Sequence, residues 1–353
     1  MSNQQPLVSV VTPVYNGEAY LAECIESVLR QSYRNFEYLI VNNCSKDRTL
    51  EIARDYSKRD GRVRVFDNQE FLDVISNHNH AFRLISGEAK YCKVVSGDDL
   101  IFPDCLERMV ELGKSHPEVG IVGCYQLSGD RILWQGFEYP RNVFSGREIC
   151  RQIFLGGDSR FGFGSPTSIL YRADLVRASA AFYPNSSPHS DTSACFEQIR
   201  HCSYGFVYQV LCYERKHEAT QTSKSLELNR YASAYLNDLL KYGPAFLSKD
   251  EMERCVKAEL SSYHQFLAIN YFAGFRNREF WDYHRGRLAE LGYPLKRLHL
   301  LKAAFVALDR KAANPGLALQ KLRDRLSARW RARTAKAGTS ESKGAYSHSG
   351  SRS

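Results

Sequence analysis

Residues 7–29 read LVSVVTPVYNGEAYLAECIESVL. The stretch begins with an apolar run, Leu7–Val14, that is rich in β-branched side chains and therefore predicts a buried strand. The remainder places apolar side chains at helical spacing, as at Leu21, Cys24 and Val28. A strand followed at once by an amphipathic helix is typical of the βαβ unit, in which a helix joins two parallel strands.

The same alternation continues downstream. Apolar runs at 36–41, 63–66 and 91–95 predict three more strands, and helical spacing at 48–56 and 76–85 predicts the helices between them. This order predicts an α/β fold with an open, mostly parallel sheet flanked by helices. Such sheets bind ligands beyond the carboxyl ends of their strands. Polar residues at those ends are the first candidates for a site: Tyr15, Asn16, and the segments 42–47 and 96–99.

The rest of the chain divides into two parts. Apolar runs mixed with Gly, Pro and aromatic residues extend the sheet-containing domain to residue 225, and apolar spacing then predicts a helical region at 226–315. Residues 316–353 form a basic segment that we expect to be partly disordered, because few apolar residues are available to bury. This segment holds nine Lys or Arg against two acidic residues, or +7 of the net charge of +9.

Composition narrows the class of protein. Hydrophobic residues make up 43% and charged residues 25% of the 353 residues, which suits a large globular core. We expect a cytoplasmic protein, because the first residues lack a signal-peptide pattern and no apolar run is long enough to span a bilayer. The ten cysteines include no CxxC pair and are expected to be reduced, mostly buried thiols. Nucleic acid is an unlikely partner, since the excess charge lies in the final segment.

Five motifs occur in a characteristic order: VSVVTPVYNGEAYLAECIESVLRQSY (8–33), LIVNNCSKDRT (39–49), SGDDLIFPD (96–104), HSDTSACF (189–196) and YERKHEATQTS (213–223). Together they resemble the family 2 glycosyltransferases, whose fold is called GT-A. The resemblance covers about residues 6–225. It implies an enzyme that moves a sugar from a nucleotide-diphosphate sugar to an acceptor hydroxyl with inversion, in cell-surface polysaccharide synthesis. It also implies a nucleotide-binding half at about 1–100 and an acceptor half at about 101–225.

The resemblance assigns the metal and diphosphate end of the site. Asp98 matches the family's metal-coordinating aspartate, with Asp99 beside the metal or the ribose, and Ser96 stands where the family has another aspartate. The expected cofactor is a divalent cation, Mg²⁺ or Mn²⁺, because hard cations prefer oxygen ligands. His217 resembles a histidine that reaches the diphosphate or completes the metal shell, and Arg215 would add positive charge there. Each assignment has a structural alternative. His217 could be an ordinary loop residue, and residues 96–99 could form a turn before a helix whose N-cap is Asp99.

The resemblance also assigns the donor-binding residues. Pro13, Tyr15 and Asn16 resemble the segment that packs on the base, although Tyr15 could instead fill the core. Asn43 stands where the family commonly has an aspartate, and an amide can still bind a pyrimidine edge. Ser45 fits the same motif.

The resemblance suggests roles for three further residues and one segment. Asp47 either caps the helix at 48–56 or lies near the donor. Asn79 is the candidate for a helix asparagine near the donor, and the segment 163–167 resembles an acceptor-side loop. Asp191 occupies the place of the catalytic base, which takes the acceptor proton. Its alternative role is to cap a helix at 192–200.

Other functions are weighed against this one. A catalytically impaired sugar-nucleotide-binding protein is suggested by Asn42, Asn43 and Ser96, which replace acidic residues. A nucleotidyltransferase would want a Gly-rich loop with Arg and Lys near the N-terminus. A dinucleotide-binding oxidoreductase would need a Gly-rich turn after the first strand, where this chain has PVYNG.

The expected partners follow from the resemblance and from charge. The donor would be a nucleotide sugar, with a UDP-sugar favoured, and the acceptor a saccharide or a lipid-linked saccharide. Residues 295–310 and 317–331 mix Leu, Phe and Trp with Arg and Lys at helical spacing, which suits peripheral contact with the inner face of a membrane. Helices packed on the catalytic domain with solvated basic faces are the alternative.

Overall fold

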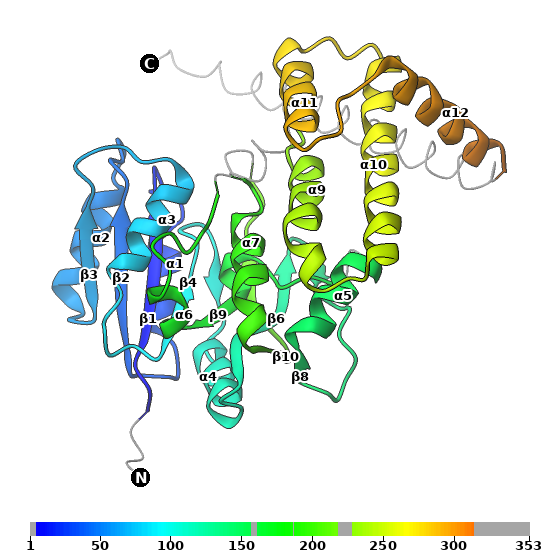
Figure 1. Cartoon of the computed structure of the whole chain (residues 1–353). Coiled ribbons are helices and arrows are strands. Elements are labelled where there is room, and N and C mark those ends of the chain that lie inside the picture. Colours follow the sequence, from blue (N-terminus) through cyan, green and yellow to red (C-terminus); the bar gives the residue numbers. More distant parts are fainter. Residues whose placement is uncertain (1–4, 157–160, 186, 218–227, 314–353) are drawn as a thin grey trace, which may run out of the picture. The chain divides into compact units, whose positions relative to one another are not determined.

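The computed structural model describes residues 5–156, 161–185, 187–217 and 228–313. Contacts divide the chain into two compact units, one running to Glu259 and one starting at Leu260. The unit that holds the sheet therefore extends past the domain boundary predicted at residue 225. Figure 1 shows the elements of both units.

The first unit contains ten strands in its described residues. Their bounds are β1 Val8–Val14, β2 Phe36–Asn42, β3 Val63–Asp67, β4 Tyr91–Val94, β5 Leu100–Ile101, β6 Val119–Ser128, β7 Arg131–Leu133, β8 Val143–Ser145, β9 Ile169–Arg172 and β10 Ser203–Glu214.

The helices of the chain alternate with these strands and then follow them. Their bounds are α1 Leu21–Leu29, α2 Thr49–Arg59, α3 Val74–Arg83, α4 Cys105–Ser115, α5 Gly146–Gly156, α6 Ala173–Arg177, α7 Ser190–Gln198, α9 Tyr231–Tyr242, α10 Lys249–Phe272, α11 Arg278–Glu290 and α12 Arg297–Ala313.

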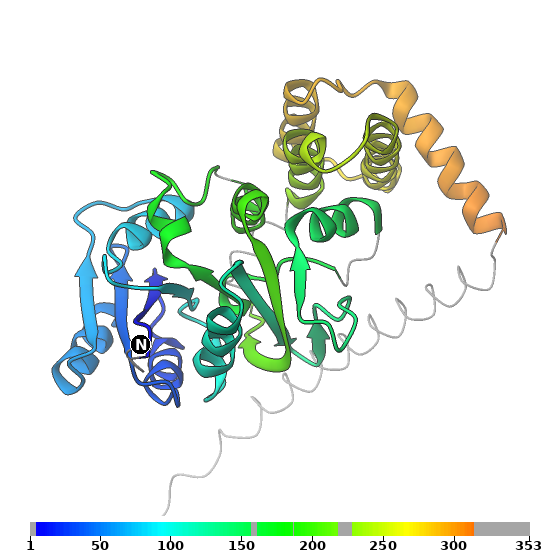
Figure 2. The same ribbon diagram turned by 60° about the horizontal axis from the view of Figure 1, so that its bottom comes forward.

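The strands form one mixed sheet in the order β3-β2-β1-β4-β9-β6-β10-β5, with β7 and β8 paired to β6 and β10. Strands β3, β2, β1 and β4 run parallel, β9 is antiparallel to both of its neighbours, and β6 and β10 run parallel again. The predicted α/β architecture, an open and mostly parallel sheet flanked by helices, is confirmed. Figure 2 shows the sheet from a second direction.

Apolar clusters cover both faces of the sheet. Within β1, where all seven residues are buried, Val11 belongs to one cluster while Val8, Val10 and Val14 belong to the other. The side chains of a strand point alternately to opposite faces, so a strand covered on both sides has apolar residues in succession. This explains why the sequence of β1 reads as a continuous apolar run.

A local side chain determines where α3 begins. The helix α3 starts at Val74, two residues before the predicted start, because the Asp73 carboxylate accepts hydrogen bonds from the N–H groups of Ile75 and Ser76. An aspartate that caps a helix in this way typically contributes about 1 kcal/mol.

The direction of α7 follows from the strand it precedes. A short turn separates the end of α7 from the start of β10, which runs parallel to β6. The helix packs on the sheet through Cys195, whose Sγ lies 3.7 Å from the hydroxyl of Tyr171 in β9. The helix therefore runs back along the sheet (Figure 1), and its first turn lies toward the edge where β1, β4 and β10 end.

The second unit consists of helices. The hydroxyl of Tyr263 lies 2.6 Å from Nδ1 of His284, and the ring of Phe266 packs against the rings of Phe280 and His284. No helix among the described residues combines the length and the apolar character needed to cross a membrane. All ten cysteines are unpaired, and seven of them are buried. The segment 317–331 and the predicted disordered end lie outside the described residues.

Candidate active site

The loops after β1 and β2 are fastened to each other. The Asn16 N–H donates to Oγ of Ser45 at 2.9 Å, and the Lys46 N–H donates to Oδ1 of Asn16 at 2.8 Å. Asn16 has a positive φ of 50°, a conformation that asparagine adopts more readily than most residues. Both predicted donor-binding side chains thus shape the rim of the site, and their contact with a donor stays a prediction.

Asp47 spans the same two loops. Its carboxylate accepts the N–H of Thr49 in the first turn of α2 and the N–H of Glu18 after β1, both at 3.0 Å. Burial acts to raise the pKa of Asp47, but the hydrogen bond from the Thr49 hydroxyl, together with these two N–H groups, lowers it overall. Asp47 thus bonds the first N–H of α2, although Arg48 holds the N-cap position of that helix, and its contact with the donor stays a prediction.

Asn43 holds a third loop. Its side chain is buried, donates to the carbonyl of Leu72 at 2.8 Å and accepts from the Leu72 N–H at 2.9 Å and from Nδ2 of Asn68 at 3.1 Å. The amide thus pairs with a peptide group in the way that it would pair with a pyrimidine edge. Its contact with a base stays a prediction, while its role in placing residues 68–72 is evident.

An aromatic pair stands at this rim. The rings of Tyr15 and Phe71 meet edge to face with centroids 5.0 Å apart, and the residues are 44% and 61% exposed. Tyr15 is therefore not core filler. Pro13, by contrast, is buried in β1 opposite Val41, so it lies within the sheet. Its role in donor binding stays a prediction.

Asn79 joins α3 to the segment before α7. Its amide donates to the carbonyl of Tyr183 and accepts from the N–H of the same residue, both at 2.9 Å. These two bonds use one donor and one acceptor of the Asn79 amide. The predicted contact of Asn79 with the donor stays a prediction.

The motif Ser96–Asp99 does not precede a helix directly. Leu100 opens the short strand β5 and α4 begins only at Cys105, so the interpretation of Asp99 as a helix N-cap is wrong. The hydroxyl of Thr167 donates to Oδ2 of Asp99 at 2.6 Å. These residues meet because β9 runs antiparallel to β4, which places the start of β9 beside the end of β4.

The Asp99 side chain is buried, and its neighbour in the chain, Asp98, is a second carboxylate. Asp99 is 6% exposed, and burial, together with the negative charge of Asp98, raises the pKa of Asp99 to about 7. The hydrogen bonds from Thr167 and from the N–H of Arg215 act in the opposite direction. A positive charge placed nearby would favour the ionised form of Asp99, because an opposite charge lowers the pKa of a carboxyl group.

Asp98 contacts His217, which lies in the loop after β10. Oδ2 of Asp98 lies 3.0 Å from Nε2 of His217, a contact between residues 119 positions apart. The ring of His217 also packs against the ring of Tyr20, at 4.8 Å between centroids. Two of the residues predicted as metal ligands are thus brought together.

Arg215 lies beside this pair. Its Nε donates to the carbonyl of Asp98 at 3.1 Å, its guanidinium stacks 4.6 Å from the centroid of Tyr20, and its NH2 group bonds to Glu23 at 2.5 Å. A positive charge is therefore held next to Asp98 and His217, and Glu23 partly offsets it; the predicted contact of Arg215 with a diphosphate stays a prediction.

The pair fits a small metal site. Within the described residues no group of three or more His, Cys, Asp or Glu side chains is placed to hold a metal ion. Asp98 and His217 supply one carboxylate oxygen and one imidazole nitrogen. Mg²⁺ and related cations at nucleotide sites are often held by one or two protein ligands plus phosphate oxygens. The donor set is compatible with that arrangement.

Asp191 lies in the first turn of α7. The helix starts at Ser190 with His189 in the N-cap position, so Asp191 is inside the helix and does not cap one at 192–200 as the alternative role required. Burial raises the pKa of Asp191. Its position at the start of α7 places it toward the same edge as Asp98.

Sequence reasoning missed Phe71 and Glu23. Phe71 is an exposed aromatic residue within the polar stretch DNQEFLD (67–73), which is a weak but readable signal for a binding surface. Glu23 lies in the first turn of α1 and resembles an ordinary acidic residue at a helix start. Only its partner Arg215, far away in the sequence, reveals its place at the site.

Comparison with known proteins identifies the family of this chain. The model of glycosyl transferase family 2 matches residues 9–177. An uncharacterized glycosyltransferase of Bacillus subtilis, EpsJ, is 35% identical over 181 residues, which span 50% of this chain and about half, 51%, of that protein. An uncharacterized glycosyltransferase of Rickettsia typhi is 30% identical over 266 residues, which span 74% of this chain and 78% of that protein.

A solved structure supports the fold. Staphylococcus aureus TarS, crystallised with UDP-GlcNAc, superposes with a TM-score of 0.59 at 17% identity, over 86% of this chain and 88% of that one. Likeness at so low an identity concerns the fold alone, and it agrees with the GT-A type predicted from the motifs. From the family match and the Rickettsia alignment together, the chain belongs to glycosyl transferase family 2, a family of glycosyltransferases.

Proposed function

We propose that this protein transfers a sugar from a nucleotide-diphosphate sugar to an acceptor hydroxyl with inversion at the anomeric carbon. The observation that carries the proposal is the meeting of Asp98 and His217 at the sheet edge toward which the first turn of α7 brings Asp191. The transfer needs groups that stabilise the negative charge of the departing diphosphate and a base that accepts the proton of the acceptor hydroxyl. Both kinds of group are present.

The nucleotide would lie along the rim formed by the loops after β1 and β2. The exposed rings of Tyr15 and Phe71 offer faces on which a base can stack, an interaction worth about 1–3 kcal/mol for each base. Asn43 supports that surface through its bonds to Leu72, which follows Phe71 directly. A UDP-sugar remains the favoured donor, since TarS, which shares the fold, was crystallised with one.

The diphosphate would lie beside Asp98, His217 and Arg215. Asp98 and His217 would hold Mn²⁺ or Mg²⁺, which supplies positive charge that stabilises the departing nucleoside diphosphate. Asp99 follows Asp98 in the chain, and its carboxylate accepts a hydrogen bond from the Thr167 hydroxyl. Arg215 contributes a permanent positive charge, because a guanidinium does not lose its proton in proteins.

Asp191 would act as the base. As the acceptor oxygen attacks the anomeric carbon, the bond from that carbon to the diphosphate oxygen breaks on the opposite side, and the acceptor proton moves to the Asp191 carboxylate. Attack opposite to the leaving group gives inversion. A raised pKa strengthens the carboxylate as a base while leaving it ionised above that pKa.

The test is a panel of nucleotide sugars assayed with and without Mn²⁺ or Mg²⁺, with the wild-type chain, Asp98→Asn and Asp191→Asn. We expect one donor to be consumed only with cation, and both variants to lose most of that activity. Asp104→Asn is the matched control, because Asp104 belongs to the same motif but lies half-exposed at the start of α4. Mn²⁺ binding in the presence of UDP, followed by electron paramagnetic resonance, should weaken only in Asp98→Asn.

A binding-only protein would behave differently. It would bind and protect a donor, with no hydrolysis or transfer in any cation, and Asp191→Asn would then match the wild type. That outcome would refute the enzymatic proposal while leaving the nucleotide site intact.

We also propose a place for the reaction. The synthesis of a cell-surface polysaccharide on a saccharide or lipid-linked acceptor remains the function expected from the family resemblance. In α12, Leu298, Leu301 and Phe305 are exposed at helical spacing, with Arg297 and Lys302 beside them. A basic helix with an exposed apolar stripe suits the surface of an anionic membrane, which supports peripheral attachment at the inner face.

A further inference from the structure

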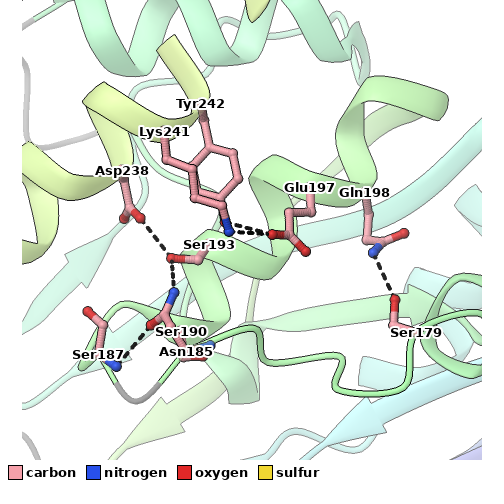
Figure 3. Close-up of polar contacts among 10 residues, drawn as sticks. All are labelled: Ser179, Asn185, Ser187, Ser190, Ser193, Glu197, Gln198, Asp238, Lys241 and Tyr242. Carbon is pink, nitrogen blue, oxygen red and sulfur yellow. Dashed lines mark hydrogen bonds and ion pairs between the residues drawn. The ribbon is translucent and has the colours of Figure 1, made fainter. Parts of the chain in front are cut away.

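A buried polar cluster joins α7 to α9. Figure 3 shows its core, in which the hydroxyl of Ser193 donates to Oδ1 of Asp238 at 2.7 Å and Nδ2 of Asn185 donates to the same hydroxyl at 3.1 Å. Asp238 is only 2% exposed. A buried carboxylate is costly unless it is paired with a positive charge or fully hydrogen-bonded. One bond from a hydroxyl does not meet that need.

The partner that Asp238 faces is His189. Its Nδ1 lies 3.4 Å from Oδ2 of Asp238, and neither atom has a hydrogen-bond partner among the described residues. The imidazole is buried and is held against the rings of Tyr231 and Tyr235, with centroids at 5.2 and 4.4 Å. A protonated imidazole would complete the pairing of the carboxylate. The N-cap position of α7 is thereby attached to α9.

The two residues act on Asp191 in opposite directions. After the effect of burial, the positive charge of His189 lowers the pKa of Asp191, and the negative charge of Asp238 raises it. His189 likewise lowers the pKa of Glu259 in α10, which burial raises. The titratable groups that face Asp191 from the surrounding elements are His189, Cys195, Tyr171, Tyr183, Tyr235 and Asp238.

We propose that Asp238 and His189 are positioning residues for Asp191: they anchor the first turn of α7 on α9 and set the charge balance around the proton-accepting carboxylate. The inference rests on the proposed function, since only transfer to a hydroxyl requires that carboxylate. Both residues lie beyond residue 177, where the match to the family model ends. The working catalytic unit therefore includes α9.

The test is a titration of Asp191 in the full chain, with ¹³C-labelled aspartate carboxyl groups observed by nuclear magnetic resonance. The resonance missing from Asp191→Asn identifies the group. Asp238→Asn keeps an oxygen for the Ser193 hydroxyl and removes the negative charge, so the midpoint of Asp191 should move to lower pH. His189→Asn keeps a donor near the place of Nδ1 and removes the positive charge, so the midpoint should move to higher pH.

Activity provides a second readout with the donor identified by the panel. The acid limb of the pH–rate profile should move to lower pH in Asp238→Asn and to higher pH in His189→Asn. The kcat of each variant should fall roughly 10- to 100-fold, as when the partner that orients a functional ligand is removed. The KM for the donor should stay near that of the wild type, because Tyr15, Phe71 and Asp98 are untouched.

Glu197→Gln is the matched control. Glu197 joins the same two helices through Lys241 and Tyr242, at 2.8 and 3.0 Å (Figure 3). At the rise of an α-helix it lies about 9 Å further along α7 than Asp191. This variant loosens the helix contact without changing the charges next to Asp191, so the Asp191 midpoint should match the wild type. A shift as large as that of Asp238→Asn would overturn the inference in favour of simple helix packing.

The two proposals fail in different ways. If Asp191→Asn is inactive but neither charge variant moves the midpoint, the role of Asp238 and His189 is refuted and glycosyl transfer stands. If the midpoints move in opposite directions but no donor is consumed, the electrostatic coupling stands and the proposed function is refuted. Should Asp238→Asn not fold, as judged by its thermal unfolding, the upward shift expected in His189→Asn decides alone.

Discussion

Replacing Asn43 with alanine should both destabilise the protein and weaken nucleotide binding. The buried amide makes three hydrogen bonds, two with the Leu72 peptide group and one with Asn68. At about 0.5–1.5 kcal/mol for each bond, their loss should lower the free energy of unfolding by about 2–4 kcal/mol. Phe71 precedes Leu72, so the released segment should also displace the stacking ring. The UDP dissociation constant should then rise about 5- to 150-fold, the equivalent of 1–3 kcal/mol of stacking.

Urea unfolding measures the first effect and isothermal titration calorimetry with UDP the second. Asn35→Ala is the control, because the Asn35 amide makes a single bond at the surface, to the carbonyl of Gln5. That variant should stay within about 0.5 kcal/mol of the wild type. Asn43→Asp should lie between, since a carboxylate still accepts from Leu72 but cannot donate to its carbonyl. If Asn43→Ala unfolds like the wild type, or binds UDP as tightly, the loop-support argument is refuted.

Four other outcomes are expected. Phe71→Ala should weaken UDP binding about 5- to 150-fold in calorimetry while leaving the unfolding midpoint unchanged, and unaltered affinity would exclude stacking. The kcat of the wild type should fall as pH drops through the raised pKa of Asp191, because the base must be ionised, and a flat profile would contradict that role. Leu301→Glu with Phe305→Glu should reduce co-sedimentation with anionic vesicles, and equal pelleting would exclude α12 as the contact. Leu21→Ala, at a fully buried position in α1, should cost about 2–5 kcal/mol in urea unfolding, and a loss below 1 kcal/mol would mean that the site repacks.

The order of the elements was predictable because it depends on local periodicity. Side chains alternate across a strand and recur every three to four residues along a helix, so the buried run of β1 and the apolar face of α1 can be read directly. The edge at which we expect ligands to bind followed from the parallel strands. The start of α3 differs from the expected one by two residues because its cap, Asp73, is a single side chain that periodicity does not register.

The partners of polar side chains were not predictable in the same way. The donor contacts expected of Asn43 and Asn79 stay predictions, while the bonds of their amides to the peptide groups of Leu72 and Tyr183 had no signal in the sequence. The alternative role of Asp99 as a helix cap is wrong, and its carboxylate accepts the hydroxyl of Thr167 instead. An amide or carboxylate bonds to whatever lies within about 3 Å of it, and that depends on how distant loops are placed.

The amino-acid sequence by itself therefore determined the α/β architecture, the edge proposed to carry the site and the residue types available there, since these depend on spacing over a few turns or strands. Only the tertiary structure decided that Asp98 meets His217, that Phe71 stands beside Tyr15, and that Asp238 faces His189. These contacts join segments far apart in the chain. They form because the sheet brings the loops at its strand ends, and the helices packed on it, into register, which no local pattern encodes.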